Sequence, residues 1–526
     1  MGRKTLFNLL AVLTIVLAVG FLYYPTLNGF FQQDEWNGFA WFILNQKSSL
    51  IDTLKFFFAP NTGHYNPFAV GIQYLIYHFW GLDYTKYATL GVILHAGVAV
   101  SVYFLANKIL KGNILYSFVA ALLFGIFAAP FQATAWEVVN VATLGAALLG
   151  VISSILFFTY LDRHQLKFLV WSLVYLVLSL LFKETTIGLF VIFFVLARSR
   201  RKLILSFGLG YFLFRASMYL VPTVSPGGVM GQPVETIIYN FLTVPFKAIS
   251  QIIIPPNFLK ALSLVLAELF SQNITGIPGS PEFEAFSVRI ILEILSIALG
   301  LIVVTFAFLK KSKQRLFLGV GWAIVNSLVF SFAPGTRESV SIVDSRNLYF
   351  ISIGIAIFIV SLFSQISGGN LKYFSTLIVI AVLLNLYWLK VNLSEFVAAG
   401  VVRKNILQKI INDYPNLPQR IIFYMASDIS YYGLPESTKI LPFQSGLGQT
   451  LLVWYYKTEN FPKDFFKDSF LWEIEAQGYK EFGSRGFGYF RELDLLKETQ
   501  TRYNIDENSI ISYSWEGRIQ KLEKIH

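Results

Sequence analysis

The stretch TLFNLLAVLTIVLAVGFLYY, residues 5–24, decides the fold class of this chain. It carries no charge, and a helix of this length crosses the hydrocarbon core of a bilayer, roughly 30 Å. Of the 526 residues, 55% are hydrophobic and only 14% are charged. Soluble domains carry roughly 25% charged residues. Because similar uncharged runs recur up to about Lys390, the sequence predicts a polytopic membrane protein.

Apolar runs and the breaks between them predict about eleven membrane crossings. We expect these crossings near residues 5–24, 88–107, 114–130, 140–160, 166–182, 185–198, 202–221, 286–309, 316–333, 347–364 and 371–390. Two other apolar segments are left out. Residues 66–80 are short and interrupted by polar residues, which suits an interfacial or re-entrant helix. Residues 237–270 are broken by Pro245 and the Pro255-Pro256 pair, and form either two interfacial helices or a tight hairpin.

The basic residues of the short loops predict the orientation, because cytoplasmic loops are enriched in Lys and Arg. The strongest anchor is the run Arg198-Ser199-Arg200-Arg201-Lys202, which is cytoplasmic if the N-terminus is cytoplasmic. The same bias explains the net charge of +11 without a nucleic-acid partner. The outer loops are then 25–87, 131–139, 183–184, 222–285 and 333–347. The chain is expected to be a multi-pass protein, of the plasma membrane in a prokaryote.

The composition changes after Lys390, which divides the chain into a transmembrane domain, 1–390, and a soluble domain, 391–526. An odd number of crossings places the soluble domain outside the cytoplasm. Strand-like pieces at 420–425 and 510–514 predict a small α/β domain. The Gly-rich segment 482–488 lacks the flanking strand and helix of a phosphate loop, so we expect a surface loop. The expected fold is mainly α, a helical bundle with extracytoplasmic loop helices and a small C-terminal α/β domain.

Two adjacent carboxylates, Asp34 and Glu35, stand in the first outer loop. In the purely structural explanation, Asp34 caps the helix that starts near Trp36, and Glu35 interacts favourably with the positive end of its dipole. A carboxylate near a membrane is costly, however, and this setting favours function. Asp34 is the candidate base that deprotonates a hydroxyl. The pair also permits a divalent cation, Mg²⁺ or Mn²⁺, without requiring one.

Further candidates follow in the other outer loops. They are His64 and Tyr65 in the first loop, Glu137 in the second, Lys183 and Glu184 in a tight hairpin, and Arg337 and Arg346 in the last. Lys183 and Arg346 are the expected phosphate ligands, because an ammonium and a guanidinium both bind phosphate oxygens. The structural alternatives are snorkelling for the Lys183-Glu184 hairpin and interface anchoring for Arg346 and His64.

The ordered set of loop motifs resembles the GT-C class of membrane glycosyltransferases, in particular its protein O-mannosyltransferase-like branch. The motifs are the acidic pair, His64-Tyr65-Asn66-Pro67, Glu137, Lys183-Glu184-Thr185 and Ser345-Arg346-Asn347-Leu348-Tyr349. This resemblance covers about residues 1–390. It departs from the family where Ala129-Pro130 replaces a His-Pro ahead of the second-loop acid and Arg346-Asn347 replaces an Arg-Tyr.

The resemblance implies an inverting transfer from a polyprenyl-phosphate sugar to an acceptor hydroxyl of a protein, glycan or lipid. It also implies that an acid of the first loop acts as base or supports the acceptor, and that basic residues hold the lipid phosphate. Three alternatives remain open, one of them a non-catalytic membrane scaffold. A lipid-polysaccharide polymerase or ligase would use the long loop 222–285. A transporter or flippase would place ionisable residues within the spans, which we expect to be nearly free of central charges.

Overall fold

The computed structural model describes most of the chain. The described residues are 3–32, 34–59, 65–218, 233–271, 281–309, 313–332, 342–430, 437–443, 446–459 and 461–525. A bundle of helices precedes the C-terminal domain. They are α1 (Arg3–Tyr23), α5 (Tyr84–Ile109), α6 (Ile114–Ile126), α8 (Glu137–Arg163), α9 (Leu166–Leu180), α10 (Leu189–Leu196), α11 (Arg201–Ser217), α12 (Val234–Ile253), α13 (Pro256–Ser271), α14 (Pro281–Leu309), α15 (Lys313–Ser327), α16 (Leu348–Ile366) and α17 (Leu371–Asp413).

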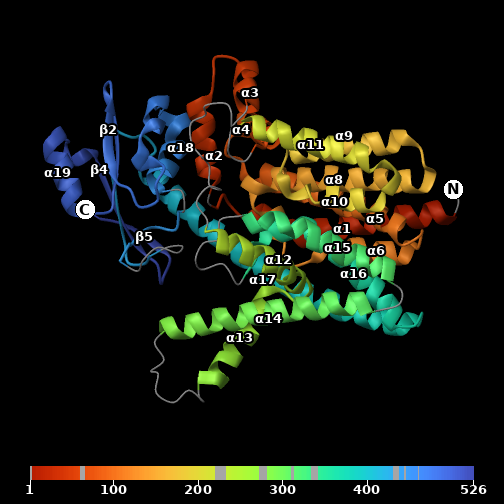
Figure 1. The fold of residues 1–526 in the computed structure, drawn as a ribbon. Helices are drawn as coiled ribbons and strands as arrows, with labels where there is room; N and C mark the ends of the chain where they lie inside the picture. The colour runs from red at the N-terminus through yellow and green to blue at the C-terminus, as the bar shows by residue number, and fades with distance from the viewer. Residues whose placement is uncertain are drawn as a thin grey trace.

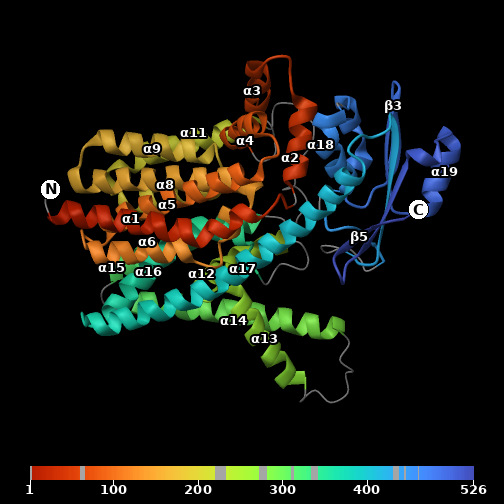
Figure 2. The same cartoon turned by 180° about the vertical axis from the view of Figure 1, so that it is seen from behind.

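Shorter elements lie between these helices. They are α2 (Glu35–Asn45), α3 (Leu50–Phe58), α4 (Pro67–Trp80), α7 (Gln132–Ala135) and 3₁₀ turns that include Tyr24–Asn28, Glu184–Thr186 and Ser345–Asn347. Helices α1, α5, α6, α8 and α9 run side by side, with the N-terminus at one end of the bundle and the C-terminal domain at the other (Figures 1 and 2). Helices α2, α3 and α4 lie at the end near the C-terminal domain. The first outer loop is therefore a small helical layer between the two parts.

In the described part of the chain, eight helices are long and apolar enough to cross a membrane. Seven of them coincide with expected crossings. Three shorter apolar helices coincide with three more, and α11 occupies the expected crossing at 202–221. The eighth long helix, α12, lies in the segment that was left out. Pro245 sits inside α12 without ending it, since α12 packs against α14, α15 and α16, and the break comes only at Pro255-Pro256.

The outer surface of the bundle is apolar. The side chains of Phe21, Leu309 and Tyr387 are 81%, 77% and 63% exposed, and many other large apolar side chains share this exposure. Large contiguous apolar surfaces are rare on proteins that live in water. Together with eight long apolar helices, this surface is that of an integral membrane protein.

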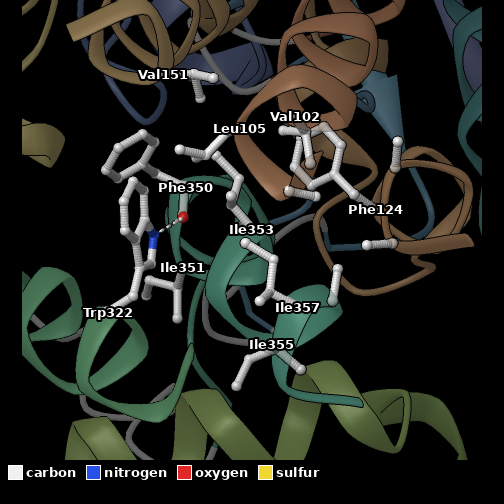
Figure 3. Close-up of a cluster of buried hydrophobic side chains, with 14 of the residues drawn as sticks. Val102, Leu105, Phe124, Val151, Trp322, Phe350, Ile351, Ile353, Ile355 and Ile357 are labelled. Atoms are coloured by element: carbon white, nitrogen blue, oxygen red, sulfur yellow. Dashed lines mark hydrogen bonds between the residues drawn. The ribbon is translucent and has the colours of Figure 1, made fainter. Parts of the chain in front are cut away.

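The centre of the bundle is built around α16. Every residue from Leu348 to Ser361 is buried. Trp322 of α15 donates a hydrogen bond from its indole nitrogen to the Phe350 carbonyl at 2.9 Å, among side chains of α5, α6 and α8 (Figure 3). A Cβ added to Gly354 would lie 2.5 Å from the Gly319 carbonyl oxygen, so α15 and α16 approach each other closely at these glycines. This close packing fixes the start of α16, where Arg346 lies.

The C-terminal domain contains a five-stranded sheet of order β2-β3-β1-β4-β5. Its elements are β1 (Arg420–Ser427), α18 (Leu447–Glu459), β2 (Gly478–Phe482), β3 (Arg485–Phe490), α19 (Leu493–Tyr503), β4 (Ile510–Glu516) and β5 (Lys521–Lys524). Strand β1 pairs in parallel with β3 and β4, while β2 and β5 add antiparallel hairpins. The two strands expected from the sequence, at 420–425 and 510–514, are confirmed.

The expectation of a surface loop at 482–488 is wrong beyond its first residues. The turn is confined to Gly483-Ser484, where Gly483 has φ 62°, and Arg485 begins β3. The glycines at 486 and 488 are strand residues that make room for the Tyr479 ring, since a Cβ at either would lie within 2.8 Å of it. Glycine inside a strand often marks such a close approach.

Sheet and bundle share one hydrophobic core. Ile421 and Phe423 of β1 pack with α18 and, through it, with Trp36 and Phe42 of α2. The opposite face of the sheet packs against α19. Helix α17 passes without a break through the domain boundary expected at residue 390 and ends at Asp413. The C-terminal domain therefore lies against the first outer loop.

Candidate functional site

Outer loops that are far apart in the sequence meet at the end of the bundle near the C-terminal domain. The Ser345 hydroxyl donates to the Ala129 carbonyl and accepts from the Gln132 amide at 3.2 Å, which joins the last outer loop to the second. The Phe68 amide donates to the Leu181 carbonyl at 3.3 Å, which joins the first loop to the Lys183-Glu184 hairpin. The described candidate residues of these loops therefore lie at the same end of the bundle.

Asp34 immediately precedes α2 and occupies its N-cap position. Its side chain makes no capping hydrogen bond, although its carbonyl accepts the Gly38 amide at 3.0 Å. The carboxyl is half-buried and interacts electrostatically with Arg346. Burial raises the pKa of Asp34 above its usual value, and the Arg346 charge opposes that rise. Helix capping therefore does not account for this carboxylate.

Arg346 stands in the 3₁₀ turn that precedes α16. Its Nε donates to Asp344 Oδ2 at 2.8 Å, and its guanidinium lies 4.9 Å from the Trp136 ring centroid. These contacts hold the guanidinium plane, and the terminal nitrogens donate no hydrogen bond to any described residue. A planar fork with unused donors is suited to the oxygens of a phosphate.

Lys183 lies in the turn between α9 and α10. Its Nζ donates to Thr143 Oγ1 at 3.0 Å, its one hydrogen bond within the described residues. Burial lowers the pKa of Lys183 to about 8, and the Arg346 charge adds to this effect while Asp344 and Glu184 oppose it. An ammonium has three donors, so two remain for a ligand.

Asp34, Lys183 and Arg346 therefore lie in one region, because the charge of Arg346 acts on the carboxyl of Asp34 and on the ammonium of Lys183. The Asp34 carboxylate has no hydrogen-bond partner among the residues that the structure describes. One site thus combines a carboxylate that can accept a proton with two cations that can hold an anion.

Glu35 and Glu137 line a cavity that does not include Asp34, Lys183 or Arg346. This cavity of about 40 Å³ lies between α2, α4 and α8, and Gln73 and Asn140 also line it. Glu35 and Glu137 are each 3% exposed and close enough to interact electrostatically, and the Tyr84 hydroxyl lies beside them. Two buried carboxyl groups this close repel each other when both are charged. The acidic pair of the sequence is thus split, with Asp34 facing Arg346 and Glu35 facing Glu137.

Glu184 and Tyr65 belong to a third group. Glu184 pairs with Arg215 of α11 at 3.8 Å, and the Arg215 guanidinium lies 5.5 Å from the Tyr65 ring centroid. The Tyr65 hydroxyl donates to the Phe58 carbonyl at 3.0 Å. Sequence reasoning did not select Arg215, although a charge inside an expected span was a usable signal. Glu184 neighbours the site through Lys183, whereas Tyr65 interacts with α11.

Two predicted site residues, His64 and Arg337, lie outside the described residues. Among those described, no group of three or more His, Asp or Glu side chains could hold a metal ion. Because Asp34 and Glu35 have different neighbours, a cation shared by both would require one side chain to turn. The expectation of Mg²⁺ or Mn²⁺ on this pair therefore stays a prediction.

A buried arginine that the sequence did not reveal clamps the segment ahead of Asp34. Arg403 of α17 is 3% exposed and donates from Nη1 to Gln32 Oε1 at 2.7 Å. Its Nε donates to the Pro442 carbonyl of the C-terminal domain at 2.6 Å. A Cβ added to Gly400 would lie 2.7 Å from the Phe30 amide nitrogen, so α17 also touches this segment directly. Arg403 therefore joins bundle, first loop and C-terminal domain.

The comparisons with known proteins do not indicate a function. Compared with protein-family models and with curated proteins, the sequence gives no match. Any statement of function must therefore follow from the arrangement of Asp34, Lys183 and Arg346 and from the resemblance in the loop motifs.

Proposed function

We propose that this chain is a membrane glycosyltransferase of the GT-C class that moves a sugar from a polyprenyl-phosphate donor to an acceptor hydroxyl. One observation carries the proposal. The Asp34 carboxylate has no hydrogen-bond partner among the described residues and is within reach of the charge of Arg346, which has unused donors and also acts on Lys183. The ordered motifs in the outer loops support the O-mannosyltransferase-like branch.

In the proposed reaction, Asp34 takes the proton of the acceptor hydroxyl. The acceptor oxygen attacks the anomeric carbon of the donor, and the bond from that carbon to the phosphate oxygen breaks. Polyprenyl phosphate leaves with the electron pair, and Lys183 and Arg346 stabilise the charge that grows on it. Burial raises the pKa of Asp34, which makes it a stronger base than an exposed Asp.

The topology forms part of the proposal. With the N-terminus cytoplasmic, eleven crossings, to which segment 237–270 adds either a hairpin of two or none, place the site and the C-terminal domain on the extracytoplasmic side. The position of the C-terminal domain, at the end of the bundle opposite the N-terminus, supports this arrangement (Figure 1). The polyprenyl tail would lie between helices, so the donor enters from the bilayer and the acceptor from outside.

The direct test uses the purified chain in lipid nanodiscs with polyprenyl-phosphate mannose and polyprenyl-phosphate glucose. Acceptors are a Ser/Thr peptide, an oligosaccharide and a glycolipid, each with and without EDTA. We expect transfer of one sugar to one acceptor class and release of polyprenyl phosphate. EDTA reports whether Asp34 and Glu35 hold Mg²⁺ or Mn²⁺. Failure of all donors with all acceptors would count against the proposal.

One observation favours a transporter or flippase as the second candidate. Glu293 of α14 is a charge inside the expected crossing 286–309, and it forms an ion pair at 2.9 Å with Lys247 of α12, which is 1% exposed. The Tyr239 hydroxyl donates to the same carboxylate at 2.7 Å. Because the pair is mutually neutralised, packing of α12 on α14 explains it. Movement of a fluorescent lipid-phosphate sugar across vesicles without transfer would favour transport instead.

Arg403 provides a prediction about positioning. Arg403→Met is expected to lower the unfolding temperature, because a buried acceptor left unpaired costs about 1–3 kcal/mol, and Gln32 and Pro442 both lose a donor. It should also slow transfer, since misplacing a catalytic group by about 1 Å costs roughly 100-fold. Thermal unfolding and initial rates measure the two effects.

The matched control for Arg403 is the neighbouring cation, Lys404→Met, which should change neither quantity. Arg403→Lys should recover part of the stability and less of the rate, because an ammonium cannot reproduce the fork that reaches Gln32 and Pro442 together. Wild-type transfer in Arg403→Met would show that the clamp does not position Asp34.

A further inference from the structure

A second cavity lies where the first outer loop meets the C-terminal domain. It holds about 130 Å³ between α2, α4 and α18. Phe42 and Gln46 of α2, Tyr74, Tyr77 and His78 of α4, and Tyr456 of α18 form its walls. Helices α2 and α18 lie side by side in both views (Figures 1 and 2). Neither the bundle nor the C-terminal domain forms this cavity alone.

The polar side chains that line this cavity have hydrogen-bonding groups to offer a ligand. The hydroxyls of Tyr74, Tyr77 and Tyr456, the imidazole of His78 and the amide of Gln46 form no side-chain hydrogen bond with any described residue. Tyr74 is only 3% exposed. Gln46 and His78 are exposed and Tyr77 and Tyr456 are half-buried, so these polar groups are open to a ligand that enters the cavity from solvent. Burial raises the pKa of Tyr77, with the neighbouring Tyr456 and Tyr74 adding to this effect, so its hydroxyl stays a donor.

The mixture of ring faces and hydroxyls identifies the ligand class. The Phe42 and Tyr74 ring centroids are 5.6 Å apart, and those of Tyr74 and His78 are 5.9 Å apart at an angle of 32°. A sugar ring has an apolar C–H face that packs on the negative face of an aromatic ring, and hydroxyls around its edge. A hydrocarbon tail would leave the five polar groups unpaired.

The charge and the volume of the cavity narrow the class of ligand further. No cation is among the lining residues. Lys463 lies at the edge of the cavity, where its Nζ donates to the Gln46 carbonyl at 2.6 Å. A phosphate would lack the paired cations that Lys183 and Arg346 provide elsewhere. The volume of about 130 Å³ is far more than the roughly 10–15 Å³ that one water molecule needs. A single neutral sugar ring, partly open to solvent, matches this space.

We propose that this cavity is a subsite for a neutral sugar of the acceptor, so that the acceptor is an oligosaccharide. This assignment rests on the proposed transferase function. Asp34 directly precedes α2 and Gln46 directly follows it, so the two lie at opposite ends of this helix, roughly 18 Å apart at 1.5 Å per residue. The sugar bound here is therefore some units away from the reacting hydroxyl. Tyr456 gives the C-terminal domain a part in acceptor recognition.

The test is ligand binding to the full chain in nanodiscs, without donor. Saturation-transfer NMR with mannotriose and with chitotriose reports contact, and titration gives the affinity. We expect one trisaccharide to bind, and Tyr77→Phe/Tyr456→Phe to weaken it about tenfold, because each variant removes one hydroxyl and keeps the ring. Gln46→Ala is a second, independent variant at the half-open edge. Tyr387→Phe, with a ring 63% exposed on α17, should bind as wild type.

Several outcomes overturn the subsite. The first is that neither trisaccharide binds to the wild type. The second is that binding is unchanged in both the tyrosine double variant and Gln46→Ala. A Ser/Thr peptide that binds in their place, and is weakened by the same variants, also overturns it.

The transfer assay separates this inference from the proposed function. If the wild type transfers sugar and Tyr77→Phe/Tyr456→Phe leaves the KM for an oligosaccharide acceptor unchanged, the subsite fails and the function stands. If no donor supports transfer but a trisaccharide still binds in a tyrosine-dependent way, the function fails and the cavity remains a sugar site. In the expected case, KM rises about tenfold in the double variant while kcat is retained.

Discussion

Asp34→Asn is expected to slow sugar transfer roughly 100- to 10,000-fold, the range by which a positioned general base contributes. Asparagine keeps the shape of the side chain but cannot take the proton of the acceptor hydroxyl. Because no described residue donates a hydrogen bond to the Asp34 carboxylate, the fold loses no partner and the unfolding temperature should be unchanged. Initial rates at saturating donor, with thermal unfolding of the same preparations, measure both.

The control for this variant is Asp52→Asn in α3. Asp52 is another acid of the first loop, exposed and 3.4 Å from Lys55, and its replacement should leave the rate unchanged. The pH profile gives a further check. Because the base acts only when deprotonated, transfer should fall as the pH drops through the raised pKa of Asp34, above the ordinary value of about 3.9. A wild-type rate in Asp34→Asn would remove this residue from the mechanism.

Removing the charge of Lys183 is the second large effect. Lys183→Met is expected to lower kcat roughly 100- to 1,000-fold, as when one donor to a developing negative charge is lost. Burial lowers the pKa of Lys183 to about 8. The ammonium is charged below that pH and loses its proton as the pH rises through it. Wild-type transfer should therefore decline on the alkaline side of about pH 8.

Lys183→Arg separates charge from geometry. A guanidinium stays charged throughout this range, so the alkaline decline should move to higher pH even if the rate itself is lower. Lys372→Met, at an exposed cation in the first turn of α17, should leave the profile unchanged. If the alkaline decline of Lys183→Arg coincides with that of the wild type, another group titrates there.

The sequence was most informative about the helices. An uncharged run long enough to cross a bilayer has few alternatives to a helix, and so the long apolar runs appear as helices close to the expected bounds. Segment 237–270 shows a case in which the local apolar pattern gave the wrong helix boundary. Pro245 was taken as a break, yet neighbouring helices hold α12 together around it, and that support is invisible in a local pattern. For the same reason the pattern could not show that α17 continues beyond Lys390.

The candidate site was predictable only as a set of loops. Positive-inside reasoning and the motif order selected Asp34, Lys183 and Arg346, and the structure brings these three together. Which way each carboxyl faces was not predictable, because Asp34 and Glu35 are neighbours in sequence with different surroundings in space. Contacts such as Arg403 with Gln32 join residues far apart in the chain, and no single-sequence pattern contains them.

The length of α17 has a mechanical consequence. Its 43 residues extend roughly 65 Å at 1.5 Å per residue, about twice the thickness of the hydrocarbon core. It contains no proline, the usual cause of a sharp kink, and Arg403 and Gly400 press it against the first loop. A long helix without a kink acts as a rigid spacer. If the chain is the proposed transferase, α17 holds the sheet of the C-terminal domain at a fixed height above the bilayer, and the acceptor has to reach the membrane surface to react.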